Sequence, residues 1–327
     1  MHLLFRLLTI YATGLILMFF SEYFFVNEGP AQAIIGIFQS TSTAGLVSYI
    51  ELSLYYALFA VWLLIPLYYF KIGNFWALYI AAGFFGIATE GVVIPLIFTE
   101  SLSWPALSWH VIADVLLGWY LMRRILIKNS MLFTIMASIS LGLFWAFWAS
   151  WSHISDLPFI LSPGQFTVYA LITSAGLITG YVLLNFLRKT EFTPQKTEVV
   201  FFSVLTLALW LLMLSEQGIQ LLVMNPRNSI LLVIYLGIAI YTLYSYRNIA
   251  QEEKILYLFR TGIAWWNMLI LLLMPLSASG AYYFVYHYQI YPPTGLIVTL
   301  LHSSSHIFLG ISLFMVWRQI VQARHNI

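Results

Sequence analysis

Long apolar segments separated by short polar ones extend along the whole chain. A helix of about 20 mostly apolar residues is long enough to cross the roughly 30 Å hydrocarbon core of a bilayer. Such a helix satisfies its own backbone hydrogen bonds and tolerates an occasional Gly or Pro. The pattern predicts an all-α, polytopic membrane bundle of about ten transmembrane helices. We place them at residues 3–25, 47–70, 75–98, 105–127, 131–151, 164–187, 198–223, 229–246, 262–288 and 293–317.

The basic residues indicate how these helices are oriented. With these spans, all of the 14 Lys and Arg residues except Arg227 fall on one side of the membrane. Basic residues are retained on the cytoplasmic side, so both termini of this cell-membrane protein are predicted to be cytoplasmic. Residues 26–46 are too short to span and too apolar for a free loop. Near 29–46 we therefore predict a re-entrant half-helix that enters and leaves the outer leaflet.

The composition fits this organisation, because 61% of the residues are hydrophobic and only 8% are charged. The longest polar stretches have the length of linkers, so residues 1–327 are predicted to form a single transmembrane domain with no soluble domain. The absence of cysteine excludes disulfides and thiolate metal ligands. A net charge of +2 with dispersed basic residues indicates no nucleic-acid partner. The expected partners are the lipid bilayer and a small-molecule or ion substrate.

Ionisable residues within the predicted spans are the candidates for a functional site. A charge in the middle of a bilayer costs at least about 2.5–3.5 kcal/mol, so it is expected to face a cavity or a partner. Counting inward at about 1.5 Å per residue places four of these residues roughly 12–14 Å below the outer surface. The sequence predicts a site in the outer half of the membrane. Its candidates are Glu90, His110, Asp114, Glu216, His302 and His306.

Two pairs with a spacing of four residues suggest a divalent metal ion. His302 and His306 share one helix face, where two imidazoles can bind one ion. His110 would be a third ligand, and Asp114 would either bind the metal or orient the imidazole. A b-type haem between His110 and His302 is a further interpretation. The alternative for each histidine is a hydrogen bond to a neighbouring hydroxyl, and for each buried Glu a protonated, structural carboxyl.

The ninth predicted span contains a polar, proline-containing segment that indicates a broken helix. Irregular backbone inside a membrane requires cover by protein or a wet cavity, and broken helices are common at transporter binding sites. A proline kink satisfied by neighbouring groups is the alternative. The residues of this predicted helix break are Pro275, Ser277, Ser279 and Gly280.

Aromatic and acidic residues gather at the predicted outer ends of the spans. Trp145, Trp148 and Trp151 recur at a spacing of three, which we interpret as an interfacial belt that also packs. Glu22 and Glu51 belong to a set of outer carboxylates that gives this side a negative field attractive to cations. Solvated loop charges are the simpler interpretation of each of them.

Transport is the function that these features favour. A carrier of a cation, a metal ion or a proton-coupled small solute would use Glu90, Asp114 and Glu216 as ion ligands or proton relays. His302 and His306 would supply further ligands or proton acceptors. A structural subunit, in which the buried acids only pack, is an open alternative.

An intramembrane, metal-dependent hydrolase acting on a lipid or isoprenoid from the outer leaflet is the second reading. Three histidines would hold a metal that activates water, and Asp114 or Glu90 would be the catalytic base. The combination of His110, Asp114, His302 and His306 loosely resembles the seven-helix ceramidase and receptor-hydrolase superfamily, which ends in a His-x-x-x-His helix. The resemblance covers two short motifs, the span count differs, and Ala106 stands where that family has Ser.

Overall fold

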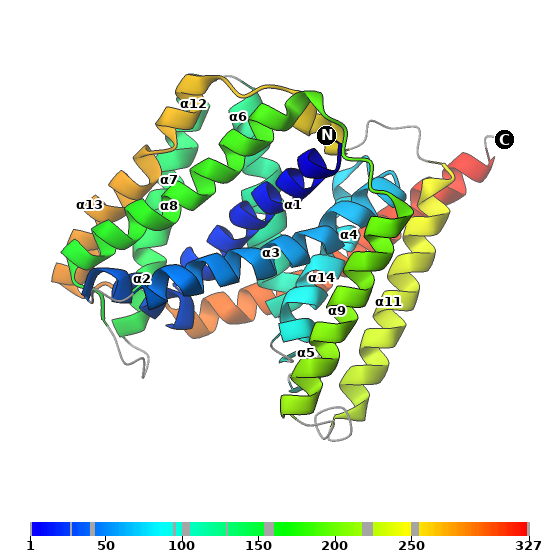
Figure 1. The fold of residues 1–327 in the computed structure, drawn as a ribbon, viewed down its shortest axis with the longest axis horizontal. Coiled ribbons are helices and arrows are strands. Elements are labelled where there is room, and N and C mark those ends of the chain that lie inside the picture. The colour runs from blue at the N-terminus through cyan, green and yellow to red at the C-terminus, as the bar shows by residue number, and fades with distance from the viewer. Residues whose placement is uncertain are drawn as a thin grey trace.

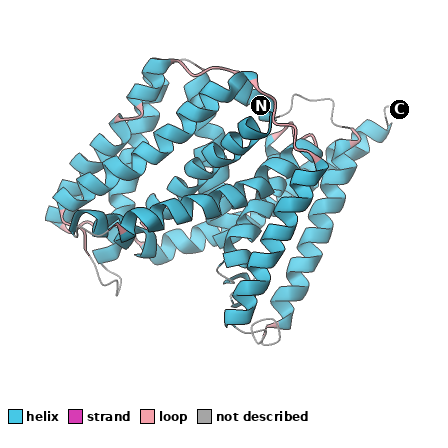
Figure 2. Ribbon diagram, in the orientation of Figure 1, coloured by secondary structure: helices cyan, strands magenta, loops and turns pink. Residues whose placement is uncertain are grey.

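Every regular element is helical in the part of the chain that the computed structural model describes (Figure 1; Figure 2). The described residues are 2–26, 28–39, 43–93, 96–99, 105–128, 130–153, 160–217, 225–249 and 255–325. The predicted all-α class is therefore confirmed. The longer helices are α1 (His2–Met18), α2 (Glu28–Gln39), α3 (Ala44–Tyr69), α4 (Phe75–Ala88), α7 (Met131–Ala149), α8 (Pro163–Phe186), α9 (Lys196–Gln217), α11 (Pro226–Arg247), α13 (Leu273–Tyr288) and α14 (Thr294–His325). Shorter pieces are α5 (Leu96–Thr99), α6 (Arg123–Ile127), α12 (Trp265–Ile270), and the 3₁₀ turns η5 (Ser150–His153), η6 (Leu187–Lys189) and η7 (Ile255–Arg260).

Among the described residues, nine helices are long and apolar enough to cross a membrane. Each begins within three residues of a predicted span, and most also end within three residues of it. The exceptions are the segments that end at Val92 and Ser215, where residues 98 and 223 were predicted, and α14, which continues to His325. The remaining predicted span is also helical, from Pro105 to Ile127, but His110 and Asp114 make it less apolar. These helices are those of a multi-pass membrane protein.

Side-chain caps explain where two of the helices begin. The Asn74 side chain accepts a hydrogen bond from the Ala77 amide at 2.9 Å at the start of α4. In front of α8, Ser162 and Gln165 exchange side-chain to backbone bonds, and Pro163 occupies the first turn. Such caps satisfy the amide groups that a helix start leaves free. Local sequence therefore sets these boundaries.

The core of the bundle forms around α1, which packs against α3 and α8 (Figure 1). Of the 18-residue window in Phe75–Val92, 72% is buried, against 6% in Lys196–Ser215 and 11% in Thr294–His325. The last two segments, in α9 and α14, thus expose apolar side chains along most of their length. Lipid tails are as apolar as these side chains, so such faces are suited to the bilayer.

Helices α7 and α13 pack closely against each other, with Gly142 facing Ser277. A Cβ atom at Gly142 would overlap Ser277 Oγ and the Met274 carbonyl oxygen. Small residues let membrane helices approach in this way. Ser277 thus has a packing role at this contact.

The interruption of the ninth predicted span lies about one turn before the predicted position. α12 ends at Ile270 and α13 begins at Leu273, so the break falls at residues 271–272. The physical reason is Pro275, which has no amide hydrogen to donate and whose ring crowds the carbonyl of residue 271. The other residues of the predicted break lie within the regular helix α13: Ser277, Ser279 and Gly280.

A short helix, α2, occupies most of the segment predicted to be a half-helix. Its 12 residues measure about 18 Å, too short to cross a bilayer. It packs mainly against α3 and contacts α8 as well. Its position relative to the membrane surface stays a prediction.

Candidate functional site

Three helical segments change to π-helical hydrogen bonding at neighbouring places in the bundle. They are η1 (Phe19–Tyr23), η2 (Thr89–Val93) and η4 (Pro105–Met122), and η4 packs against both of the others. In a π-helix the hydrogen bonds span five residues, and such segments are rare and frequent at functional sites. Each of the three contributes polar side chains to one buried cluster.

His110 of η4 lies at the centre of this cluster. Its Nε2 atom is 2.7 Å from Glu90 Oε1 of η2, and its Nδ1 atom is 2.8 Å from Asp114 Oδ2 of η4. Both ring nitrogens therefore contact a carboxylate. A protonated imidazole, which has two N–H donors, fits this arrangement without rearrangement. The structure thus brings together three of the six predicted site residues.

A chain of hydroxyl groups continues from His110 to a third carboxylate. Ser21 Oγ lies 3.2 Å from His110 Nδ1. The Tyr56 hydroxyl of α3 lies 2.5 Å from both Ser21 Oγ and Glu22 Oε1. Ser21 and Tyr56 were missed in the sequence because a hydroxyl in an apolar span carries no distinctive signal. Glu22 was visible there only as one of several outer carboxylates.

The cluster contains more acidic groups than basic ones. The side chains of Asp114, His110 and Glu90 are 0%, 7% and 13% exposed, respectively. In the described part of the chain, the only ion-pair partner of Glu90 and of Asp114 is His110. Buried charges are costly unless they are paired. A single imidazolium cannot balance the carboxylates of both Glu90 and Asp114, so the cluster needs a proton or another cation.

One oxygen on each of two carboxyls of the cluster is open to a further contact. Glu90 Oε2 and Asp114 Oδ1 are buried and have no hydrogen-bond partner among the described residues. Buried polar atoms are normally satisfied. These two atoms could hold a proton, a water molecule or a cation.

Indole groups fix the end of the first helix beside the cluster. Trp145 donates a hydrogen bond to the Tyr23 carbonyl at 3.1 Å, while Trp148 and Trp151 donate to the Phe25 carbonyl at 3.2 and 3.1 Å. The carbonyl groups at a helix end have no partner within the helix. The tryptophans predicted to form an interfacial belt thus also position η1 and its polar side chains.

The predicted histidine pair lies elsewhere, on α14. The rings of His302 and His306 are 4.8 Å apart, and His306 Nδ1 bonds the His302 carbonyl at 2.9 Å. Within the described residues, no hydrogen bond or ion pair joins either ring to Glu90, His110 or Asp114. No group of three or more His, Cys, Asp or Glu side chains in these residues is arranged to hold a metal ion. The geometry therefore does not assemble the predicted three-histidine ligand set, and a haem between His110 and His302 would require His110 to leave a carboxylate.

Glu216, the remaining predicted member, lies in the last turn of α9. Its side chain falls outside the part of the structure that is described. The residues of the predicted helix break, Pro275 to Gly280, belong to α13, which packs mainly against α7 and α8.

Comparisons with known proteins give no relative from which a function could be transferred. The chain matches no protein-family model, no curated protein and no solved structure.

Proposed function

We propose that this protein is a transporter of the cell membrane that couples the movement of a small solute to protons at the His110 cluster. The observation that carries the proposal is the buried imidazole held between two carboxylates, Glu90 and Asp114. Ionisable groups placed inside a membrane bundle mark proton relays and ion pathways. The nine apolar helices found in the described residues are long enough to carry such a pathway across the bilayer.

Protons fit this geometry better than a metal ion bound by His110. A metal ligand needs a free lone pair on one ring nitrogen, while here both nitrogens lie within 2.8 Å of carboxylate oxygens. Loss of a proton from the imidazole would leave one carboxylate without a donor and would favour a rearrangement. The protonation state of His110 is therefore tied to the local conformation, which proton coupling requires.

The hydrogen-bonded groups provide a route along which a proton could move. From Glu90 through His110, Ser21 and Tyr56 to Glu22, each neighbouring pair of polar atoms lies within 3.2 Å. Every group in this series can exchange a proton or reorient a hydroxyl. Movement of the proton along it requires no metal and no external cofactor.

The orientation follows from the basic residues. In the proposed topology, the segment Pro105–Ile127 also crosses the membrane and brings the number of crossings to ten. Both termini are cytoplasmic, and α2 dips into the outer leaflet. The cluster then lies in the outer half of the membrane.

Reconstituted vesicles test the proposal directly. A panel of small solutes would be added outside sealed vesicles that contain a pH-sensitive dye, and luminal pH would be followed. We expect at least one solute to change luminal pH with the wild-type protein and the change to be abolished by Glu90→Gln. Glu51→Gln is the matched control, because it removes an exposed carboxylate from α3. Solute uptake that is unaffected by Glu90→Gln and moves no protons would contradict the proposal.

A further inference from the structure

Arg123 is a buried cation with hardly any partner. The residue begins α6 directly after η4, and it is 1% exposed. The Nη2 atom donates to the Phe259 carbonyl at 3.2 Å, but Nε and Nη1 have no hydrogen-bond partner among the described residues. No carboxylate of these residues forms an ion pair with it. Leaving a buried charge uncompensated costs several kcal/mol, so such an arginine is suited to receiving an anion.

Aromatic rings separate Arg123 from a nearby pocket. The guanidinium carbon lies 4.4 Å from the centre of the Phe259 ring, which also lies 4.6 Å from the Trp119 ring. Trp119 donates a hydrogen bond to Thr13 at 3.4 Å. Phe259 and Thr13 both line the pocket. Arg123 is thus one aromatic side chain away from the pocket, which we call the Thr13 pocket.

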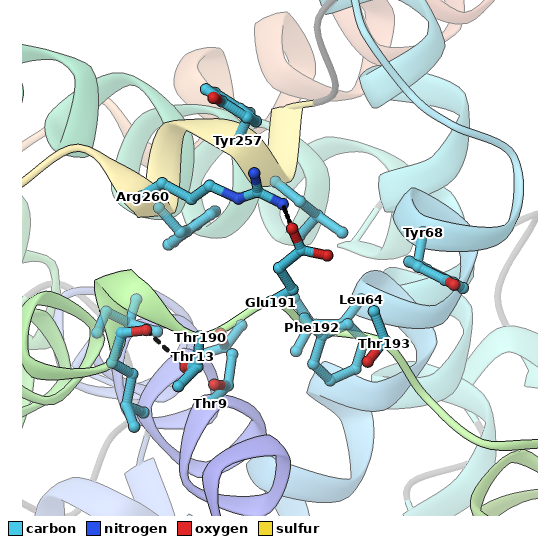
Figure 3. Close-up of a pocket in the computed structure, with 14 residues that line it drawn as sticks. Thr9, Thr13, Leu64, Tyr68, Thr190, Glu191, Phe192, Thr193, Tyr257 and Arg260 are labelled. Atoms are coloured by element: carbon cyan, nitrogen blue, oxygen red, sulfur yellow. Dashed lines mark hydrogen bonds and ion pairs between the residues drawn. The ribbon is translucent and has the colours of Figure 1, made fainter. Parts of the chain in front are cut away.

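The Thr13 pocket is small, and leucine and phenylalanine side chains line it together with hydroxyl-bearing ones (Figure 3). Its volume of about 70 Å³ has room for a few water molecules or one small solute. At its edge Arg260 forms an ion pair with Glu191 and lies 4.5 Å from the Tyr257 ring. The hydroxyl-bearing residues that line it are Thr9, Thr13, Tyr68, Thr190, Thr193 and Tyr257.

The backbone of the wall that covers Arg123 is anchored on both sides of Phe259. The Ile255 amide donates to the Ile72 carbonyl at 2.7 Å, and Ile263 exchanges two hydrogen bonds with the Asn185 side chain. Phe259 lies between these anchors in η7. Rotation of this one side chain would connect the guanidinium with the pocket without unfolding either anchor.

We propose that the Thr13 pocket binds a small monovalent carboxylate, and that Arg123 receives the carboxylate group when the Phe259 ring turns aside. Counted together, Glu191, Arg260 and Arg123 carry one excess positive charge, which one carboxylate neutralises. Arginine binds carboxylates through two parallel N–H donors, and Nε and Nη1 are the atoms left open here.

The position of the pocket relates it to the His110 cluster. α1 and η1 form one continuous helix that carries Thr13 at the pocket and Ser21 at the cluster, roughly 12 Å apart along its axis. η4 likewise carries Asp114 and leads directly into Arg123. As an assignment of the transported solute, the inference rests on the proposed function. A proton at the cluster and a carboxylate at Arg123 would together carry no net charge.

Thermal unfolding of the detergent-purified full chain tests carboxylate binding, with tryptophan fluorescence as the readout. Sodium acetate and sodium lactate are the probes, with sodium phosphate, glycine and sodium chloride at matched ionic strength for comparison. We expect acetate or lactate to raise Tm in a saturating manner and Arg123→Gln to abolish the shift. Arg124→Gln is the matched control, because this neighbouring arginine is exposed and its guanidinium donates to the Tyr120 hydroxyl at the surface. It is expected to retain the full shift.

Each other outcome decides against the assignment. No carboxylate shift in the wild type, a shift with phosphate alone, or an equal shift in Arg123→Gln and Arg124→Gln would overturn it. If Arg123→Gln does not fold, Arg123→Lys is used in its place, because it keeps the charge without the paired donors. We expect this variant to need at least a tenfold higher carboxylate concentration for half of the maximal Tm shift. Full affinity in Arg123→Lys would overturn the assignment as well.

The binding test does not depend on proton coupling. Glu90→Gln is expected to retain the carboxylate shift in detergent, where no gradient exists. Carboxylate binding without proton movement in vesicles would refute the proposed function alone. Proton-coupled flux of another solute, without carboxylate binding, would refute only the assignment of the Thr13 pocket.

Discussion

The His110 cluster and the His302–His306 pair start from the same local motif and end in different surroundings. Each places a histidine four residues from a second potential ligand on one helix. His110 is buried and holds a carboxylate on each ring nitrogen, whereas the rings on α14 lie next to one another and His306 is exposed. The spacing is thus the same, but within the described residues only the first pair forms hydrogen bonds with side chains of other segments. A four-residue spacing therefore becomes a site only where other helices complete it.

The largest expected effect comes from removing the imidazole of the cluster. His110→Ala leaves Glu90 and Asp114 without their only ion-pair partner in the described part of the chain, and we expect a loss of about 3–5 kcal/mol of stability. His302→Ala, at the other location, should change stability by less than about 0.5 kcal/mol. Unfolding by SDS titration measures both. Equal losses would show that the two locations do not differ as the structure indicates.

A smaller effect is expected when one carboxylate of the cluster is made neutral. Asp114→Asn keeps the shape and one oxygen acceptor but removes the charge opposite His110 Nδ1. We expect it to cost about 1–3 kcal/mol, since a hydrogen bond between charged groups is replaced by a weaker one. The SDS titration should show a smaller loss of stability than for His110→Ala. The luminal pH assay should show that proton coupling is lost. Unchanged coupling would remove Asp114 from the proposed proton site.

Tyr56→Phe tests whether the cluster extends to Glu22. The substitution removes the hydroxyl that contacts Ser21 and Glu22 and should cost about 1 kcal/mol. Proton movement in the vesicle assay is expected to be slowed. Tyr55→Phe is the control, because this neighbour has no side-chain hydrogen bond within the described residues. If both variants behave alike, the cluster ends at His110 and its two carboxylates.

Metal analysis tests whether the His302–His306 pair on α14 binds a metal ion. The His302→Ala/His306→Ala double variant should contain as much metal after purification as the wild-type protein, because the pair lacks a third ligand in the described residues. Elemental analysis of both proteins in detergent provides the measurement. A stoichiometric metal that is lost in the double variant would show that His302 and His306 are metal ligands. It would then favour the metal-dependent enzyme over the transporter.

His153 provides the smallest effect and a contrast in pH dependence. His153 lies outside the predicted spans, and its Nε2 atom is 3.0 Å from the Tyr282 hydroxyl. Burial lowers the pKa of this histidine below the usual 6.5. The neutral form is favoured in the folded state, so its contribution is present above about pH 6.5 and decreases as pH falls below that value. Unfolding titrations at pH 7.5 and 5.5 should therefore show a slightly smaller loss on acidification in His153→Gln. A larger loss in the variant would contradict this assignment.

The helices were predictable because membrane crossing imposes a length and a composition that can be read locally. The predicted break in the ninth span was displaced by about one turn, since the effect of Pro275 falls on the residues before it. The spacing of His110 and Asp114 was visible, but Glu90 could be matched to them only by an approximate depth. Which residue faces which across a bundle depends on helix rotation, and hydropathy alone does not specify rotation.

Arg123 and Arg124 illustrate the boundary between the two kinds of information. The sequence by itself determined that both belong to a helix end rich in positive charge, and with it the all-α, multi-pass architecture and the ionisable residues inside the spans. Only the tertiary structure decided that Arg123 is 1% exposed while Arg124 remains exposed, and that the described partner of Glu90 is His110 and not His302. The physical reason is that hydropathy and charge act on each segment separately. Burial and pairing, by contrast, arise only when segments distant in sequence pack together.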